Sequence, residues 1–318
     1  MSQWKAEPID DRSLCSPWIA GRAKSIRAAK RIIAPADCRA HAGCCTWLNG
    51  AYWVDVLAGR PDGHVVVSNC GDIGKKKQDC IQAAVEKDSL FRLLRGEDVS
   101  MWQARPSLHI ILAQNEDSDS SEALSEDLLK RTRPATYRYF ASFESELRGR
   151  SGYRKYLSGE PFYSVYNCGS HVFAQWKIVW REQASFLTSA VVGPLEDRAV
   201  VPDHKLMIVP FCGPKQAYFA CGVLSTSVAA YIVVSYAVQT STTTHVLNYV
   251  PVPNYQETSE LHRQIASLCQ RGHAAVGKGD EKQVLACKAE LDTSAARLWG
   301  LTDAELKDIQ DSLQDLIG

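Results

Sequence analysis

Hydrophobic and polar residues alternate most clearly in the stretch from Pro161 to Arg181. Its last six residues read Trp-Lys-Ile-Val-Trp-Arg and predict a strand whose side chains point alternately to two faces. One face carries two tryptophans and an isoleucine, and the other carries Lys177, Val179 and Arg181. Such a strand either belongs to a core and has two charges at its edge, or holds Lys177 and Arg181 rigidly toward an anion.

The same periodicities predict the other elements of the chain. Helices are expected at 20–33, 124–130, from Pro134 through Leu147, and at 214–225. Strands are expected at 51–57, 64–69, 108–113, 186–192, 206–211 and 246–253, the first two joined by a Pro-Asp-Gly turn. The apolar segment 228–238 is compatible with a helix or a strand.

The pattern becomes purely helical after two prolines near residue 253. Helices are predicted at 258–271, 281–299 and 303–316, with a glycine-rich turn at 272–279. We therefore expect an α+β fold, in which a mixed-sheet domain at 1–254 is followed by a segment at 255–318 that contains an antiparallel helical pair.

Composition places the chain among ordinary globular proteins, with 45% hydrophobic and 23% charged residues in 318. No apolar run approaches the length of about 18 residues that a membrane helix needs. The first residues also contain no apolar core typical of a signal sequence. We expect a cytoplasmic protein without a membrane partner.

The net charge is zero, but the charges are segregated along the sequence. Residues 20–40 contain six basic residues and one acid, whereas residues 302–318 contain five acids and one lysine. Segregation of this kind produces local potentials that the net value conceals. The basic segment is either a solvated helix face or a helix that contacts phosphates.

The 11 cysteines form no Cys-x-x-Cys pair and read mainly as small buried thiols. Cys38, His41, Cys44 and Cys45 have a spacing that zinc could use, although a second ligand pair is missing. This zinc site is the less favoured interpretation, and we expect no metal in the chain.

Two further motifs come close to known catalytic patterns. The run 272–279 nearly spells a phosphate-binding loop, but it follows a helix and has glycine where magnesium needs a hydroxyl group. Asp203 and Lys205 resemble the end of a metal-dependent nuclease motif, yet no partnering acid precedes them at the proper spacing. Neither motif predicts an enzyme by itself.

A resemblance to a known family emerges from six blocks taken in order. They are Ala-Tyr-Trp-Val-Asp-Val-Leu (51–57), Leu-Leu-Arg-Gly-Glu-Asp-Val (93–99), Pro-Ala-Thr-Tyr-Arg-Tyr-Phe (134–140), Pro-Phe-Tyr-Ser-Val-Tyr-Asn-Cys-Gly (161–169), Phe-Ala-Gln-Trp-Lys-Ile-Val-Trp-Arg (173–181) and Leu-Trp-Gly-Leu-Thr-Asp-Ala-Glu-Leu (298–306). Together they resemble the target-recognition region of N6-adenine DNA methyltransferases of restriction-modification and phage-defence systems, the single-chain restriction-methylase type.

The resemblance implies recognition of DNA and not methyl transfer. Enzymes of this family carry a glycine-rich cofactor motif and an Asn-Pro-Pro-Tyr motif, and this sequence contains neither. The segment 44–48 also departs from the glycine- and asparagine-rich run expected there. The chain is thus expected to be a specificity subunit or a fragment of a larger enzyme. S-adenosylmethionine would belong to a partner methyltransferase that docks on the C-terminal helices, and this chain would hold no cofactor.

Recognition of double-stranded DNA needs cations for the phosphates and polar groups for the base edges. The candidate phosphate ligands are Lys24, Arg27, Arg31, Lys75, Lys76, Arg154, Lys155, Lys177 and Arg181. The candidates for further contacts to phosphates or bases are Thr242, Thr243, Thr244 and His245, and those for base readout are Asn167, Ser170 and His171. The alternatives are an interaction scaffold without DNA readout and a nuclease that uses Asp203 and Lys205.

Overall fold

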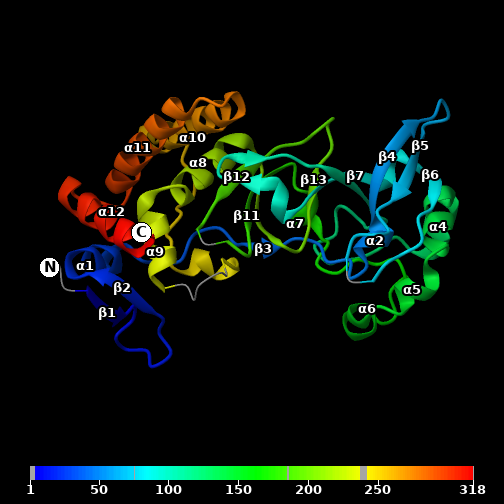
Figure 1. The fold of residues 1–318 in the computed structure, drawn as a ribbon, viewed down its shortest axis with the longest axis horizontal. Coiled ribbons are helices and arrows are strands. Elements are labelled where there is room, and N and C mark those ends of the chain that lie inside the picture. The colour runs from blue at the N-terminus through cyan, green and yellow to red at the C-terminus, as the bar shows by residue number, and fades with distance from the viewer. Residues whose placement is uncertain (1–3, 75, 185, 237–241, 318) are drawn as a thin grey trace.

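The computed structural model describes residues 4–74, 76–184, 186–236 and 242–317. The molecule is elongated, with helices α8 to α12 and α1 at one end and strands β4 to β6 with helices α2 and α4 to α6 at the other (Figure 1). Strands β3, β11 and β12 lie between these two ends (Figure 1).

The elements have the following bounds. The strands are β1 Trp4–Pro8, β2 Trp18–Arg22, β3 His41–Ala42, β4 Trp53–Gly59, β5 His64–Asn69, β6 Gln82–Glu86, β7 Leu90–Leu94, β8 Val99–Ser100, β9 Gln103–Ala104, β10 Leu108–Ile111, β11 Trp176–Arg181, β12 Ser189–Val192, β13 Val200–Pro202 and β14 Leu206–Phe211. The α-helices are α1 Ala23–Ile32, α2 Asn49–Tyr52, α3 Glu126–Thr132, α4 Pro134–Ala141, α5 Glu144–Arg148, α6 Ser151–Tyr156, α7 Ser170–Phe173, α8 Pro214–Leu224, α9 Ser227–Tyr236, α10 Glu260–Lys278, α11 Glu281–Leu298 and α12 Asp303–Ile317. The 3-10 helices are η1 Lys87–Ser89, η2 Gly96–Asp98 and η3 Thr244–Asn248.

A six-stranded mixed sheet forms one end of the molecule, with the strand order β13-β7-β10-β4-β5-β6. Its pairs are antiparallel except for β13 and β7, which run parallel. The predicted hairpin is confirmed, because β4 and β5 pair across the turn at Arg60–Gly63. A bulge between Val56 and Ala58 shifts the register within this hairpin.

The strand β11 lies in the middle of the molecule, between β12 and β14 in a four-stranded sheet that ends in β3. Its predicted alternation is confirmed. Ile178 and Trp180 belong to a hydrophobic core shared with α8 to α12, and Val179 belongs to a second core shared with the six-stranded sheet. The strand is therefore buried from both sides rather than exposed along one.

The C-terminal helices confirm the predicted antiparallel pair, since α10 packs along α11 and a two-residue turn joins them. Gly279 ends α10 in a left-handed conformation with φ of 70°, which glycine adopts without strain. The predicted turn at 272–279 is wrong, because the helix continues to Lys278. Gly272 instead allows the ring of Trp102 to lie directly against the helix backbone.

Other boundaries also differ from the sequence-based ones. The ambiguous apolar segment is the helix α9, and the expected strand at 246–253 is instead η3 followed by an irregular stretch. The expected helix from Pro134 through Leu147 is divided into α4 and α5. Among the described residues no single helix is long and apolar enough to cross a membrane. Helices α8 and α9 reach that length and apolarity only together, with a 59° bend between them.

Candidate nucleic-acid interface

Lys177 is removed from the candidate interface by its position in the fold. It is fully buried, and its Nζ donates hydrogen bonds to the carbonyl oxygens of Val172, at 2.5 Å, and Val200, at 2.7 Å. Burial lowers the pKa of Lys177 to about 7, because the charged amine is poorly solvated there. Arg181, at the end of the same strand, is exposed and stays a candidate.

Thr242 is likewise a structural residue. It is 3% exposed, its Oγ1 donates to the carbonyl oxygen of Arg181 at 2.5 Å, and its backbone N–H donates to Glu182 at 2.7 Å. Trp180 donates its indole N–H to the carbonyl oxygen of Thr242 at 2.8 Å, so Thr242 fastens this segment to the end of β11. Thr243, Thr244 and His245 are more accessible and stay candidates.

The basic helix α1 lies against the acidic helix α12, so part of the charge segregation is neutralised within the molecule. Arg31 contacts the carboxylate of Glu305 at 2.7 Å. Arg22, just before α1, contacts Asp315 at 2.7 Å and Asp311 at 3.4 Å. Arg31 is therefore paired within the molecule, while its side chain stays 53% exposed, and its contact with phosphate stays a prediction.

The remaining predicted cations lie in three places. Lys24 and Arg27 are exposed on α1 and have no ion-pair partner in the described part of the chain. Lys76 is exposed in the loop after β5, and Lys75 lies outside the described residues. Arg154 and Lys155 are exposed on α6, far along the sequence from the other three. The structure thus does not gather all predicted cations on one surface.

The turn predicted to read bases, 167–171, is built into the fold. Asn167 has a φ of 53°, and its Nδ2 donates to the carbonyl oxygens of Ala42 and Gly43. The hydroxyl group of Ser170 donates to the carboxylate of Asp119 at 2.5 Å. Both polar groups are already engaged, and Asn167 is accordingly a positioning residue for this turn.

His171 has a different environment from its neighbours in the turn. Its ring stacks on that of His41, with 4.5 Å between the centroids and 20° between the planes. Its Nε2 is buried and has no partner among the described residues. Burial, and then the adjacent His41, lower the pKa of His171 to about 4, and burial also lowers that of His41. Both rings are thus neutral at pH 7 and can each donate and accept a hydrogen bond.

The turn holding His171 pairs with the segment that contains His41. The backbone groups of Cys45 and Tyr166 exchange hydrogen bonds at 2.9 Å and 3.2 Å. Arg150, which is 2% exposed, joins the two segments from the protein interior by hydrogen bonds to the backbone of each. Its guanidinium donates to the carbonyl oxygens of Leu147, Thr46, Phe162 and Ser164 at 2.6–3.1 Å.

Three aromatic rings meet at the other end of this paired segment. Trp47, Tyr156 and Tyr166 have centroid separations of 5.2–6.0 Å, and both tyrosines are exposed, by 52% and 41% respectively. The ammonium group of Lys155 lies 4.9 Å from the centroid of the Tyr156 ring. A Cβ on Gly152 would lie 2.1 Å from Trp47, so only glycine lets α6 approach the indole ring.

These groups form a surface that we call the aromatic strip. Its side chains come from β3 and the residues beside it, in the middle of the molecule, and from the segments that lead to α6 (Figure 1). Its members are Arg39, His41, His171, Tyr166, Trp47, Tyr156, Lys155 and Arg154.

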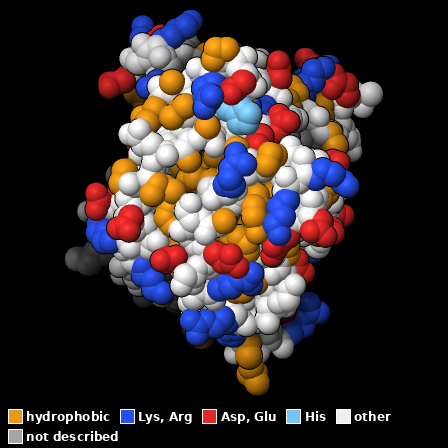
Figure 2. All heavy atoms as spheres, turned by 90° about the vertical axis from the view of Figure 1, so that its right-hand side faces the viewer, with side chains coloured by type: hydrophobic (Ala, Val, Ile, Leu, Met, Phe, Trp, Pro, Cys, Tyr) orange, Lys and Arg blue, Asp and Glu red, His pale blue; other side chains and the backbone are white. Residues whose placement is uncertain are grey.

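Sequence reasoning found Arg154, Lys155 and His171 but missed the rest of the aromatic strip. The available signal was weak: Trp47 and Tyr166 are far apart in the sequence, and nothing local indicates that they meet. A different distribution of side chains is seen on the face formed by the end of the molecule that carries β4, β5, β6 and α4. There, Lys and Arg alternate with Asp and Glu around scattered hydrophobic side chains (Figure 2).

The two catalytic or metal alternatives gain no support from the geometry. Asp203 is 4% exposed and accepts the backbone N–H of Lys205 at 3.0 Å, as in an ordinary turn. Burial raises the pKa of Asp203 to about 6. In the described part of the chain, the only group of three potential metal ligands that converges is Cys221, Cys269 and His273, and not the cysteine-rich segment 38–45.

This buried group does not suit a metal ion. The Nε2 of His273 accepts the backbone N–H of Val191 at 2.9 Å, so its proton resides on Nδ1, which lies 2.8 Å from the carbonyl oxygen of Cys269. A metal on Nδ1 would require a proton on Nε2, since ligating histidines donate their second N–H. The hydrogen bond from Val191 leaves no room for that proton.

Comparison with known proteins was informative at the level of structure and not of sequence. No protein-family model matches the sequence, and a search of curated proteins finds no match. Among solved structures, the fold is similar to that of the Type IIL restriction-modification enzyme MmeI, determined in complex with DNA, with a TM-score of 0.52 and 11% sequence identity. The match covers 89% of this chain and 35% of that one, so this chain spans about a third of the enzyme's length. The likeness establishes a shared fold with part of a restriction-modification enzyme.

Proposed function

We propose that this chain is a DNA sequence-recognition (specificity) module that binds duplex DNA and directs a partner N6-adenine DNA methyltransferase in a restriction-modification or phage-defence system. The observation that carries the proposal is the aromatic strip, with cations at both ends and neutral imidazoles and exposed rings between them. The shared fold with part of a DNA-bound restriction-modification enzyme supports it.

The aromatic strip supplies the two kinds of contact that recognition needs. Arg39 at one end and Arg154 and Lys155 at the other are exposed and contact phosphates. His41, being neutral, donates and accepts hydrogen bonds at base edges without adding charge, and His171, whose Nε2 is buried, supports the His41 ring by stacking on it. Arg181, Thr243, Thr244 and His245 extend the interface beyond β11.

The partner methyltransferase supplies the chemistry, including S-adenosylmethionine, and docks on the C-terminal helices. The acids of α12 contribute less than their number suggests, since Glu305, Asp311 and Asp315 already face arginines of the N-terminal segment.

The proposal is tested by measuring the binding of labelled duplex DNA by fluorescence anisotropy across a series of salt concentrations. We expect log affinity to fall linearly with log salt, and Lys155→Glu to weaken binding and reduce the slope by about 1. Lys282→Glu on α11 is the matched control, an exposed helical lysine away from the aromatic strip, and should change neither. Absence of duplex binding at low salt, alone and with the methyltransferase, would contradict the proposal.

A further inference from the structure

A pocket of about 330 Å³ opens beside the aromatic strip, between the end of β14 and the start of α8. Arg39 and His41, at one end of the strip, also line this pocket. A second hollow of about 550 Å³ shares both residues and extends to His171. A nucleic acid lying on the strip would therefore pass over the mouth of the pocket.

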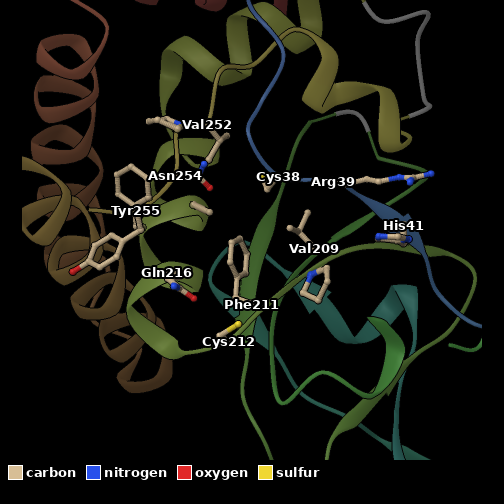
Figure 3. Close-up of a pocket in the computed structure, with 14 residues that line it drawn as sticks. Cys38, Arg39, His41, Val209, Phe211, Cys212, Gln216, Val252, Asn254 and Tyr255 are labelled. Atoms are coloured by element: carbon tan, nitrogen blue, oxygen red, sulfur yellow. The ribbon is translucent and has the colours of Figure 1, made fainter. Parts of the chain in front are cut away.

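The walls of the pocket combine the aromatic rings of Phe211, Phe219 and Tyr255 with two amide side chains. Gln216 and Asn254 point toward the ring of Phe211, while Arg39 extends away on the far side of that ring (Figure 3). Neither amide group makes a side-chain hydrogen bond within the described part of the chain. Each offers a donor and an acceptor side by side, which is the arrangement that pairs with the edge of a nucleobase.

The backbone holds these amides in place. The N–H of Asn254 donates to the carboxylate of Asp37 at 2.9 Å. The backbone N–H of Asp37 in turn donates to the carbonyl oxygen of Val252 at 2.9 Å. Gln216 lies in the first turn of α8. Phe219, buried to 1% exposure, forms part of the pocket lining. The polar groups are thus presented from fixed backbone over an apolar base.

The volume of the pocket and the charge of its lining restrict the kind of ligand that it can bind. A pocket of this volume is at the lower end of the range for small-molecule sites and holds a single small ligand. Its lining contains no aspartate or glutamate and includes one arginine, Arg39, whose side chain extends outward from it, so a phosphate beside a neutral, flat group would meet a cation and no carboxylate of the lining. A nucleotide has this combination of features.

We propose that this pocket binds one nucleobase, with Phe211 stacking on the base, Gln216 and Asn254 bonding its edge and Arg39 contacting its phosphate. The base comes either from a free nucleotide or from an unpaired nucleotide of DNA held on the aromatic strip. The second source rests on the proposed function, whereas the first does not.

The test uses the full chain and two kinds of probe. Adenosine, guanosine, cytidine and thymidine monophosphates are titrated by calorimetry, and duplexes with and without one bulged nucleotide are compared by anisotropy. Gln216→Ala and Asn254→Ala remove the edge contacts, and Gln314→Ala, an exposed amide on α12, is the control. Circular dichroism verifies that each variant is folded.

Tighter binding of a nucleotide or of the bulged duplex by wild type, lost about fivefold or more in Gln216→Ala or Asn254→Ala and retained in Gln314→Ala, is the expected result. Binding of a free nucleotide identifies the first source, and preference for the bulge alone identifies the second. Equal binding of both duplexes with no nucleotide bound would overturn the pocket and leave DNA recognition standing. Nucleotide binding without duplex binding would support the pocket and overturn DNA recognition. If neither probe bound, both the pocket and DNA recognition would be overturned.

Discussion

At the scale of single residues, two buried cations show how far a side chain's role departs from its charge. Both Lys177 and Arg150 look from sequence like members of basic clusters, yet each donates hydrogen bonds to backbone carbonyl oxygens in the interior. A pattern of charges indicates which residues could meet an anion. It does not indicate which of them the fold uses to satisfy its own carbonyl groups, because that depends on contacts distant in sequence.

The buried amine of Lys177 predicts an unusual dependence of stability on pH. Its pKa is near 10.5 in the unfolded chain and about 7 in the fold, so the unfolded state binds the proton more tightly. Stability should therefore decrease as the pH falls from about 10 to about 7, by up to about 1.4 kcal/mol per pH unit, and this contribution should be constant below that.

Urea denaturation of wild type and Lys177→Met at several pH values checks this expectation. The difference between the two free energies of unfolding should change across pH 7–10 and level off at lower pH. Parallel curves over the whole range would contradict the assignment of Lys177 as a buried amine.

Arg150 predicts a coupled loss of stability and binding. Its guanidinium serves four carbonyl oxygens, and Arg150→Met would leave them unpaired in the interior, at a cost of about 3 kcal/mol or more. Since Arg150 joins the two segments that carry the aromatic strip, duplex affinity should fall as well. Arg148→Met, at an exposed neighbouring arginine, should change stability by less than about 1 kcal/mol in the same denaturation experiment.

At the scale of elements, local patterns predicted β11, the β4–β5 hairpin and the C-terminal helices, because each depends on short-range periodicity. They failed where long-range packing decides. The run 272–279 contains three glycines and looked like a turn, but it is helical to Lys278, and its Gly272 packs against the ring of Trp102, which is distant in the sequence. The aromatic strip was missed for the same reason, since Trp47 and Tyr166 are brought together only by pairing of distant segments.

The glycines of α10 give a matched pair of expected outcomes. A Cβ at Gly272 would lie 2.4 Å from the ring of Trp102, so Gly272→Ala should destabilise the protein by about 1–3 kcal/mol. A Cβ at Gly277, in the same helix, meets nothing within 4 Å, so Gly277→Ala should stabilise it by about 0.5–1 kcal/mol. Thermal or urea denaturation measures both, and equal effects in the two variants would show that Trp102 does not pack as described.

At the scale of the whole molecule, the segregated charges join the two ends of the chain. The basic segment around α1 and the acidic helix α12 face each other through Arg31 and Glu305, and through Arg22 and two aspartates. The side chains of Ser25 and Ser312 add a buried hydrogen bond of 2.7 Å at the centre of this contact. The sequence revealed the segregation but not its partner, and so DNA was only one of the possible counter-charges.

A charge exchange tests whether α1 and α12 recognise each other. Arg31→Glu and Glu305→Arg should each lower the midpoint of thermal unfolding slightly at low salt, because each places like charges together. The double variant should recover most of the loss, and high salt should reduce all three differences. A double variant no better than the sum of the single ones would mean that the pair contributes nothing specific.

The position of β11 between two cores has a consequence for the cooperativity of thermal unfolding. Trp180 belongs to the core that contains α8 to α12, and Val179 belongs to the core that contains the six-stranded sheet. Unfolding of either half of the molecule would therefore remove buried contacts from the core of the other half. We therefore expect one endothermic peak on heating, with calorimetric and van't Hoff enthalpies that agree. Two separate peaks would mean that the halves unfold independently. A single peak would mean that the two halves, which share β11, unfold as one cooperative unit.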